Sequence, residues 1–258
     1  MVIWGTKRKL EKLGKAADFC SICHRVQPFE ISRVNMVKHV YYIPMGGGKV
    51  VGHLASCTEC SVTIFVDTAR YKTYSDQVAI SLQDLIRETN PGLEDELKNR
   101  LPLEKKIWNK QQLDPDERRF LISEPFNVIS PMMEMRYKDS LPLDKVTGRS
   151  CLLTIAIPLV VLFISSLFYR SGVGDYLKLV AYVLVGIGVL ITLFNIFTTQ
   201  SRYLDRFIYP LFAKALSPLS PTLDEITTAV NKYKKLGLIV GRKIKPQRIY
   251  DAIQQTND

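Results

Sequence analysis

The chain has 258 residues, enough for one or two modest domains, and 47% of them are hydrophobic. Its formal charge of +10 is concentrated at the ends: residues 1–70 and 200–258 each carry ten Lys or Arg against five Asp or Glu, whereas residues 71–150 carry thirteen against fourteen. Basic ends of this kind attract anionic lipid or nucleic acid, and two long uncharged runs further along argue against a purely soluble fold.

Residues 1–18 hold a strand candidate and a basic stretch, and residues 19–66 read as β-structure around cysteines. Residues 2–4 are a short apolar strand candidate, followed by a basic stretch. The runs 39–45 and 49–55 are rich in β-branched and aromatic residues, and the three glycines at 46–48 between them predict a hairpin turn. We expect Pro44 to end the first of these strands or to keep it at an edge.

Four of the five cysteines form two C-x2-C pairs, separated by 33 residues. Cys20 and Cys23 make the first pair, and Cys57 and Cys60 make the second. Each pair can present two thiolates from one tight turn, and two pairs complete the tetrahedral S4 shell of a structural zinc site. Because the predicted hairpin returns the chain between the pairs, we expect all four to ligate one structural Zn2+.

Three other roles for the cysteines explain their pattern less well. The stretch "CSICH" at residues 20–24 also fits covalent haem attachment, but haem would leave Cys57 and Cys60 without a role. Disulfides fit the even count, although the cytoplasmic location expected below is reducing. A dithiol redox motif does not explain two copies around a hairpin. Zinc accounts for all four thiols at once.

The remaining histidines and the fifth cysteine receive simpler roles. Four thiolates saturate a structural zinc ion, so His24, His39 and His53 are expected to be ordinary polar residues or residues behind the ligands. Cys151 begins the first of the two uncharged runs and is expected to be an unreactive apolar residue, with palmitoylation as the alternative.

The order of motifs in residues 1–66 resembles a family of small bacterial and eukaryotic zinc-ribbon proteins. Ile3-Trp4-Gly5, the first cysteine pair, Ile43-Pro44 and the second pair follow one another as in that family. The resemblance implies a zinc-ribbon fold in which the four cysteines are the zinc ligands, and it implies no activity. "SIC" and "TEC" stand where the family usually has Pro and Gly around the knuckles.

Residues 75–138 change to helical spacing. Apolar residues recur on one helix face before a break at 90–92 and again after it: Val78, Leu82, Leu85 and Ile86, then Leu93, Leu97 and Leu101, up to Pro102. Asp114-Pro115-Asp116-Glu117 is a typical helix start, with Pro at the first helical position. That helix should bend or stop near Pro125 and Pro131.

Residues 151–169 and 179–199 contain no formal charge, and each is long enough to cross a hydrocarbon core about 30 Å thick as a helix. Two buried core helices are the alternative. The nine-residue connection at 170–178 predicts a tight antiparallel hairpin with both flanks on one side of the membrane. No apolar stretch of signal length follows the basic residues at 1–15, so we expect this pair to direct the chain to the membrane. Close packing and hydrogen bonds across the pair are expected from small and polar residues within it: Gly186 and Gly188, and Ser165, Ser166 and Asn195.

Basic residues near the hairpin favour cytoplasmic flanks. Seven lie in the flanks and two in the connection: Arg136, Lys138, Lys145, Arg149, Arg202, Arg206 and Lys214, against Arg170 and Lys178. By the positive-inside rule we expect a two-pass integral membrane protein whose N- and C-terminal regions are cytoplasmic.

Residues 200–258 read as a small basic helical domain. Ser220-Pro221 is expected to cap a helix that ends at Gly237, with its apolar stripe formed by Leu223, Ile226, Val230 and Tyr233. Residues 238–240 are a strand candidate, and Pro246 should open a last helix through Ile249 and Ile253.

The predicted fold is therefore an α+β membrane protein in four parts. These are a zinc ribbon at residues 1–70, a cytoplasmic α-helical segment at 71–150, a transmembrane hairpin at 151–199 and a basic C-terminal helical domain at 200–258.

The sequence contains no motif that indicates catalysis. A phosphate-binding loop, His-Glu-x2-His, Gly-x-Ser-x-Gly and an aspartate-rich metal loop are all absent from it, so we expect no enzyme. The expected function is a membrane-anchored interaction or scaffold module that docks a cytoplasmic protein and meets anionic lipid. A nucleic-acid-binding, membrane-tethered regulator is the alternative, and a component of a larger enzyme or transporter assembly is the third possibility.

Overall fold

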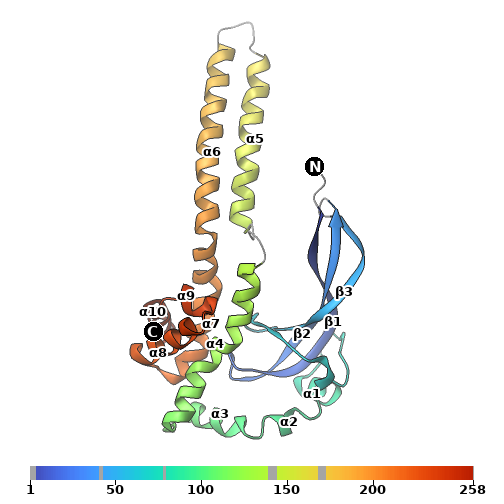
Figure 1. Ribbon diagram of the computed structural model, residues 1–258, viewed down its shortest axis with the longest axis vertical. Helices are drawn as coiled ribbons and strands as arrows, with labels where there is room; N and C mark the ends of the chain where they lie inside the picture. The colour runs from blue at the N-terminus through green and yellow to red at the C-terminus, as the bar shows by residue number, and fades with distance from the viewer. Residues whose placement is uncertain (1–3, 41–42, 78–79, 139–143, 168–172, 258) are drawn as a thin grey trace. The chain divides into compact units, whose positions relative to one another are not determined.

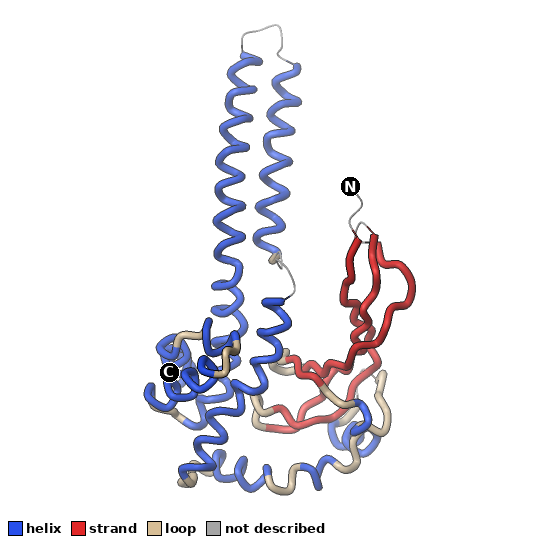
Figure 2. Tube along the Cα trace, in the orientation of Figure 1, coloured by secondary structure: helices blue, strands red, loops and turns tan. Residues whose placement is uncertain are grey.

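The computed structural model describes residues 4–40, 43–77, 80–138, 144–167 and 173–257, with β-strands near the N-terminus and helices over most of the rest (Figures 1 and 2). The chain divides into two compact units. The first combines Met1–Arg136 with Ile208–Asp258, and the second is Tyr137–Phe207. The α+β fold class is confirmed.

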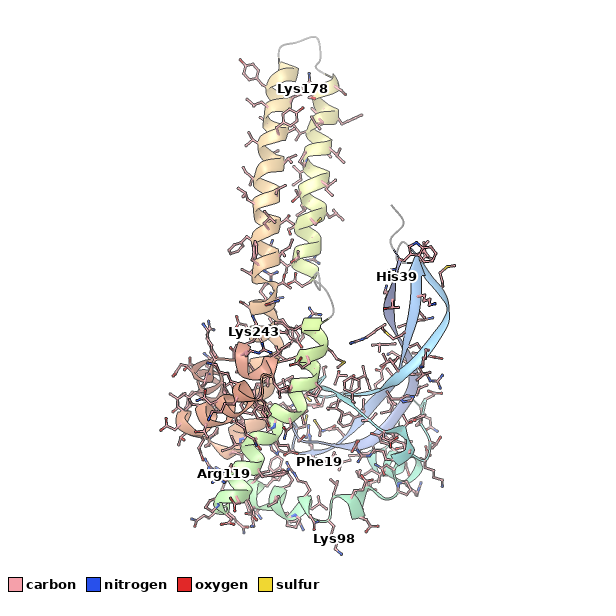
Figure 3. All side chains as sticks on the ribbon, in the orientation of Figure 1. Phe19, His39, Lys98, Arg119, Lys178 and Lys243 are labelled. Carbon is pink, nitrogen blue, oxygen red and sulfur yellow. The ribbon has the colours of Figure 1, made fainter. Side chains whose placement is uncertain are left out.

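A four-stranded antiparallel sheet contains the strands in sequence order: β1 (Trp4–Cys20), β2 (Arg25–Val40), β3 (Ile43–Cys57) and β4 (Thr63–Phe65). The basic stretch after residue 4 belongs to β1 and does not follow it. Its side chains are exposed, but its backbone pairs with β2 from Trp4 to Cys20. Pairing along a whole strand outweighs the polar composition of that strand. Phe19 and His39 mark opposite ends of this β1–β2 ladder (Figure 3).

The predicted turn at 46–48 is wrong. Val40 pairs with Ile43, so β2 and β3 are joined through residues 41–42, which lie outside the described residues. The glycines instead form a bulge in β3, because Lys38 pairs with Met45 whereas Met36 pairs with Lys49. Gly46 and Gly48 have φ of +79° and +76°, a conformation that a bulge needs as much as a turn does. The expected strand over 39–45 is not continuous, because β2 ends at Val40 and β3 begins at Ile43. Pro44 is instead the second residue of β3, where β3 pairs only with β2.

The middle of the chain forms short helices: η1 (Thr68–Arg70), α1 (Leu82–Thr89), α2 (Leu93–Glu96) and α3 (Arg100–Trp108). Of the predicted apolar face, Leu85 and Leu93 are buried against Ala17 of β1, and Val78 lies outside the described residues. The end of α1 fastens to the edge of β1. Thr89 Oγ1 accepts from the Ala17 amide at 3.0 Å, and Asn90 donates to the Ala17 carbonyl at 3.4 Å.

A continuous helix over 93–101 is not found, since α2 ends at Glu96 and α3 begins at Arg100. Pro102 lies in the first turn of α3, where its missing N–H removes no helical hydrogen bond. The next helix, α4 (Pro115–Lys138), starts where predicted and contains Pro125 and Pro131 without stopping. Its residues Phe126, Ile129 and Met133 are buried, and this packing holds the helix through both prolines.

The chain from residue 204 onward is helical: η2 (Leu204–Ile208), α7 (Tyr209–Leu216), η3 (Ser217–Leu219), α8 (Leu223–Lys235), α9 (Ile239–Lys243) and α10 (Pro246–Asn257). Helices α4, α7 and α8 meet in an aromatic core. The Phe126 ring lies 4.5 Å from the Phe212 ring and 5.3 Å from the Tyr233 ring, measured between centroids. The helix predicted to begin at Pro246 is α10, and its residues Ile249 and Ile253 are buried.

Two details of this region differ from expectation. The cap of α8 is Thr222, in a capping box with Glu225, and not Ser220-Pro221. Residues 239–240 begin helix α9, so the predicted strand at 238–240 is wrong. A Cβ on Gly241 would lie 2.1 Å from the Lys234 amide, so α9 packs directly on the end of α8. The apolar run is therefore buried by helix packing.

The second unit holds two antiparallel helices, α5 (Lys145–Leu167) and α6 (Val173–Tyr203) (Figure 1). Two helical stretches, Val146–Ser166 and Tyr176–Leu219, are long and apolar enough to cross a membrane. The second stretch extends into α7, whose apolar residues are buried in the first unit. Within this second stretch, the part that could cross a membrane is accordingly confined to α6.

The contacts between α5 and α6 come partly from unexpected residues. Ser165 and Ser166 donate to carbonyls of their own helix and not across the pair. The Thr154 and Thr192 hydroxyls lie 3.0 Å apart instead. A Cβ on Gly188 would come within 2.8 Å of Thr154, whereas one on Gly186 would meet nothing within 4 Å. Gly188 alone of the two permits the close approach.

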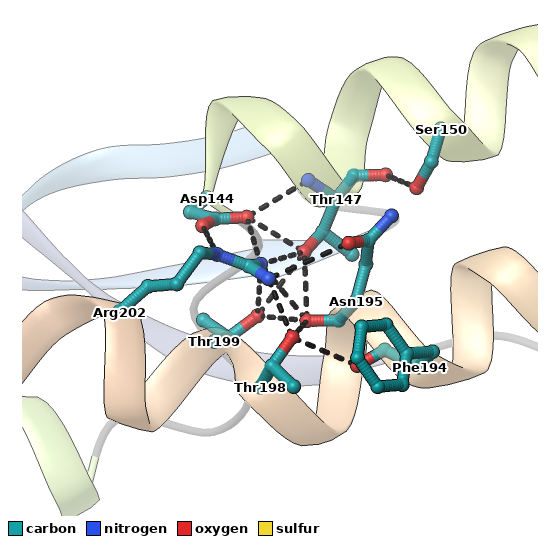
Figure 4. Close-up of polar contacts among 8 residues, drawn as sticks. All are labelled: Asp144, Thr147, Ser150, Phe194, Asn195, Thr198, Thr199 and Arg202. Carbon is teal, nitrogen blue, oxygen red and sulfur yellow. Dashed lines mark hydrogen bonds and ion pairs between the residues drawn. The ribbon is translucent and has the colours of Figure 1, made fainter.

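A polar cluster joins α5 and α6 near the residues that open α5 (Figure 4). Arg202 Nε donates to Asp144 Oδ2 at 3.0 Å, and Arg202 Nη2 donates to the Asn195 carbonyl at 2.9 Å. Thr147 and Thr199 hydroxyls lie 3.1 Å apart within it. The Arg202 guanidinium holds the pKa of Asp144 well below its usual range. Across the pair, the Asn195 backbone carbonyl accepts from the Thr147 hydroxyl at 3.4 Å, whereas the Asn195 side chain accepts from Arg202 of its own helix.

Candidate metal centre

The two cysteine pairs lie on the turns at one end of the sheet. Cys20 ends β1 and Cys23 precedes β2, whereas Cys57 ends β3 and Cys60 precedes β4. Because β2 and β3 are antiparallel neighbours, with Phe29 opposite Cys57, the sheet brings both turns together. The expected return of the chain between the pairs is confirmed, although its turn lies elsewhere.

The four sulfur atoms all lie within 4.8 Å of one another. Cys20 Sγ and Cys60 Sγ are 3.6 Å apart, and none of the five cysteines forms a disulfide. Zn–S bonds of about 2.3 Å in a tetrahedron place sulfurs about 3.8 Å apart, so the spacing fits a tetrahedral metal ion. The four cysteines are positioned to hold a metal ion.

Backbone amides reinforce the second turn. The Glu59 and Cys60 amides donate to Cys57 Sγ, and the Val62 amide donates to Cys60 Sγ. The Cys57 backbone also bonds Val62 and Ser61, each at 2.9 Å. Hydrogen bonds from N–H groups stabilise thiolates, so this turn is suited to present anionic sulfur.

The thiols influence one another strongly. Hydrogen bonds with the Cys57 and Cys60 thiols, together with burial, raise the pKa of Cys20. Hydrogen bonds from the Cys20 and Cys60 thiols, helped by backbone amides, lower the pKa of Cys57. Four thiolates this close repel one another, and a bound cation relieves that repulsion. The donor set therefore favours a soft or borderline divalent metal ion.

His24, directly after the first pair, is buried and fixed by two partners. Its Nδ1 lies 3.0 Å from Glu104 Oε2 of α3, and its Nε2 donates to the Ala215 carbonyl of α7 at 2.8 Å. Both ring nitrogens are thus used by the protein, as expected for a histidine that is not a ligand. Its role is larger than the sequence indicated, because it joins the cysteine turn to two distant helices.

Glu104 continues this connection to Arg100 and α4. Arg100 Nε donates to Glu104 Oε1 at 2.6 Å, and Arg100 Nη1 forms an ion pair with Glu124 Oε2 at 2.6 Å. The guanidinium also lies over the Phe19 ring, 5.2 Å from its centroid. Burial alone would raise the pKa of Glu104, but His24 and Arg100 outweigh it and lower that pKa. Glu104 is therefore favoured as a carboxylate between His24 and Arg100, whereas burial raises the pKa of Glu124.

A cation from α7 faces the same turns. Lys214 Nζ lies 3.3 Å from Glu59 Oε1. Burial lowers the pKa of Lys214, but the negative charges of Cys23 and Glu59 outweigh it, so the pKa is raised. A divalent metal with four thiolates carries two negative charges, and Lys214 lies where it offsets part of them.

Sequence reasoning identified the four cysteines and missed the residues around them. Arg100 and Glu104 have the spacing of a local helix pair, which gives no hint of His24. His24 and Ala215 are 191 residues apart in the chain. His39 and His53 lie on β2 and β3 outside the cysteine cluster, and Cys151 is exposed on α5.

Comparisons of the chain with protein-family models, with curated proteins and with solved structures found no match.

Proposed function

We propose that this chain is a membrane-anchored zinc-ribbon protein whose four-cysteine site holds one structural Zn2+ and whose first unit is a cytoplasmic docking module for another protein. A four-thiolate zinc is closed to water, so its role is to stabilise the fold. The order of the Ile-Trp-Gly start and the two cysteine pairs supports the assignment to zinc ribbons.

The connection through His24 carries the proposal. The first cysteine turn is bonded through this residue to α3 and α7, so it is part of the same folded unit as the helices. A metal ion that fixes the turn therefore also fixes the relative positions of these elements. That coupling is the property expected of a metal that maintains a binding surface.

The second unit supports a membrane anchor. Its helices expose large apolar side chains along their length: Leu152, Phe163, Leu190, Phe194 and Phe197 are each more than 60% exposed. A continuous apolar surface of this kind is unfavourable in water and favourable in a bilayer. The excess of basic residues in the flanks supports the cytoplasmic side for the first unit.

Metal analysis with native mass spectrometry of the detergent-solubilised chain tests the zinc site. We expect one zinc per chain, no haem absorbance, and loss of zinc in Cys20→Ser/Cys57→Ser. Cys151→Ser is the matched control and should keep the metal, because Cys151 is not in the cluster. A haem spectrum, or zinc retained in the double variant, would contradict the proposal.

Docking is tested by affinity purification in mild detergent. A genuine partner should be recovered with wild type and with Cys151→Ser, and lost with Cys20→Ser/Cys57→Ser. Equal recovery of all partners by all three forms would argue against a metal-dependent docking surface.

Tagging either terminus with a reporter that is active only in the cytoplasm checks the orientation, and both tags should be active.

One observation favours the nucleic-acid alternative. Helices α8 and α9 are joined by Leu236-Gly237-Leu238, a turn of the length and composition found in helix-turn-helix motifs. Against it, α9 has only five residues, too few for a recognition helix. Salt-sensitive binding of DNA or RNA by the purified full chain, lost in Lys243→Glu/Arg248→Glu, would favour this alternative.

A further inference from the structure

The end of the sheet opposite the cysteines is an arm formed by residues 4–10, 34–40 and 43–52. Its last row consists of Trp4, Val40 and Ile43, which pair across the three strands. Trp4 is 76% exposed, Ile43 65% and the nearby Met45 59%. Figure 3 labels His39, which lies next to this row and far along the ladder from Phe19. The arm thus ends in large apolar side chains that contact little of the described protein.

A band of basic residues follows the apolar tip. Four exposed lysines make up this basic collar: Lys7, Lys9, Lys38 and Lys49. The sequence contains no Asp or Glu between residues 4 and 10 or between 34 and 52. The first acids on the strands are Glu11 and Glu30, and these pair with Arg33 and Lys12. The stretches of strand that carry the four collar lysines therefore contain no acidic residue of their own.

The collar surrounds the arm. Lys38 and Lys49 share a sheet face with Trp4, because Thr6 pairs with Lys38 and Met36 pairs with both Arg8 and Lys49. Lys7 and Lys9 alternate to the opposite face. Lys38 is two residues from the last row, about 7 Å along the strand, and Lys49 is in the row two residues further.

Protection of an edge strand explains only part of this pattern. Exposed lysines on β1 discourage pairing with other chains. Lys38, however, lies on the central strand β2, where no edge needs protection. Edge protection also gives no reason for a tryptophan, an isoleucine and a methionine at the exposed end. An apolar tip followed by a ring of cations matches the layers of a membrane surface, where acyl chains lie beneath anionic headgroups.

We propose that the arm tip inserts into the interface of an anionic bilayer, with Trp4, Ile43 and Met45 at the acyl boundary and the basic collar among the headgroups. The dimensions agree, because the polar layer on each side of a bilayer is about 5–7 Å deep and Lys38 is about 7 Å from the tip. Tryptophan prefers this interface. This inference rests on the proposed function of a membrane-anchored protein. The arm would give the first unit a contact with lipid in addition to the α5–α6 anchor.

The chain offers a direct test, because it has only two tryptophans. In Trp108→Phe the only tryptophan is Trp4, so its fluorescence reports on the tip. This variant is placed in nanodiscs that contain phosphatidylcholine alone or with phosphatidylserine, and vesicles of the same two compositions are added. A lipid-attached quencher is put first in the nanodiscs and then in the vesicles.

We expect phosphatidylserine to shift the Trp4 emission to shorter wavelength and to increase its quenching by one of the two lipid pools at least threefold. Lys7→Glu/Lys9→Glu/Lys38→Glu/Lys49→Glu should abolish both effects, since each basic residue near an anionic surface contributes roughly fivefold to the binding constant. High salt should weaken them. The matched control reverses four exposed lysines elsewhere, Lys98, Lys105, Lys110 and Lys235, and should behave as wild type.

Ile43→Ser/Met45→Ser should reduce quenching while the response to phosphatidylserine persists, and Leu101→Ser/Leu236→Ser is its control. Zinc content, measured for every variant, shows that the ribbon has folded. Absence of quenching from both lipid pools, or an emission shift caused by RNA and not by lipid, overturns the inference. Resistance of the chain to alkaline extraction from membranes tests the α5–α6 anchor separately, so failure of the arm and failure of the anchor are distinguishable.

Discussion

His24 and Ser61 occupy equivalent positions, each directly after the second cysteine of a pair. Both have left-handed backbone conformations, with φ of +54° and +60°. Such a conformation costs a residue with a Cβ roughly 1–2 kcal/mol, so glycine is the residue that adopts it most easily. At His24 the two side-chain hydrogen bonds offset that cost, whereas the exposed Ser61 side chain makes no such bond in the described structure. His24 and Ser61 therefore share a backbone conformation, but only the His24 side chain offsets its cost.

Ser61→Gly should therefore stabilise the zinc-loaded chain by about 0.5–1 kcal/mol, the steric relief less the greater flexibility of glycine in the unfolded state. His24→Gly relieves the same backbone but removes the imidazole bonds to Glu104 and to the Ala215 carbonyl, and should cost at least about 2 kcal/mol. Urea unfolding of both variants provides the comparison. Changes of the same sign in the unfolding free energy of both variants would show that backbone strain, and not the side-chain hydrogen bonds, determines the effect of the His24 substitution.

The bond between His24 and Glu104 can be measured with a double-mutant cycle. From His24→Ala, Glu104→Ala and the double variant we expect a coupling of about 1.5–3 kcal/mol, because the pair is buried and charge-assisted. The exposed pair Asp84–Arg87 is the control and should give at most about 0.5 kcal/mol. Zinc should remain at one per chain in all variants, and its loss in His24→Ala would instead identify a ligand.

At the scale of elements, the bulge in β3 depends on Gly48. A Cβ there would lie 2.6 Å from Val37 Cγ1 and 2.7 Å from the Met36 carbonyl, and its φ of +76° excludes most other residues. Three consecutive glycines are equally suited to a turn and to a bulge, since both need positive φ. The cross-strand pairing of β2 with β3 decides between them, because Val40 pairs with Ile43 and residues 46–48 therefore lie within β3.

Gly48→Ala should destabilise the first unit by at least about 2 kcal/mol through both strain and overlap. Gly52→Ala, in the same strand, should stay within about 0.5 kcal/mol of wild type, because a Cβ there meets nothing within 4 Å. Thermal unfolding of the two variants, followed by circular dichroism, measures the difference. Equal effects at both positions would show that the bulge tolerates a side chain.

At the scale of the molecule, metal removal should affect the two units differently. The cysteine turn is bonded to α3 and α7 in the first unit, whereas α5 and α6 hold each other through their own contacts. Chelation should therefore expose the amides of α3 and α7 to hydrogen exchange and leave α5 and α6 protected in detergent. Mass spectrometry of the exchanged peptides reads this out. Unchanged protection of the α7 amides after zinc loss would show that the metal does not stabilise this helix.

The sequence by itself determined the local features. Two C-x2-C pairs predicted the cysteine cluster, because the spacing of thiols within a turn is a local property. The uncharged runs predicted α5 and α6, because length and polarity decide whether a helix can span a bilayer. The helix starts at Pro115 and Pro246 followed from local cap chemistry.

Only the tertiary structure decided what depends on distant partners. Residues 238–240 suit a strand or a helix, and the surface of α8 selects the helix. The glycines at 46–48 suit a turn or a bulge, and the pairing with β2 selects the bulge. The sequence gives no sign of the partners of His24, because Glu104 and Ala215 lie 80 and 191 residues away in the chain. Contacts at such separations arise from the packed fold, and no local pattern encodes them.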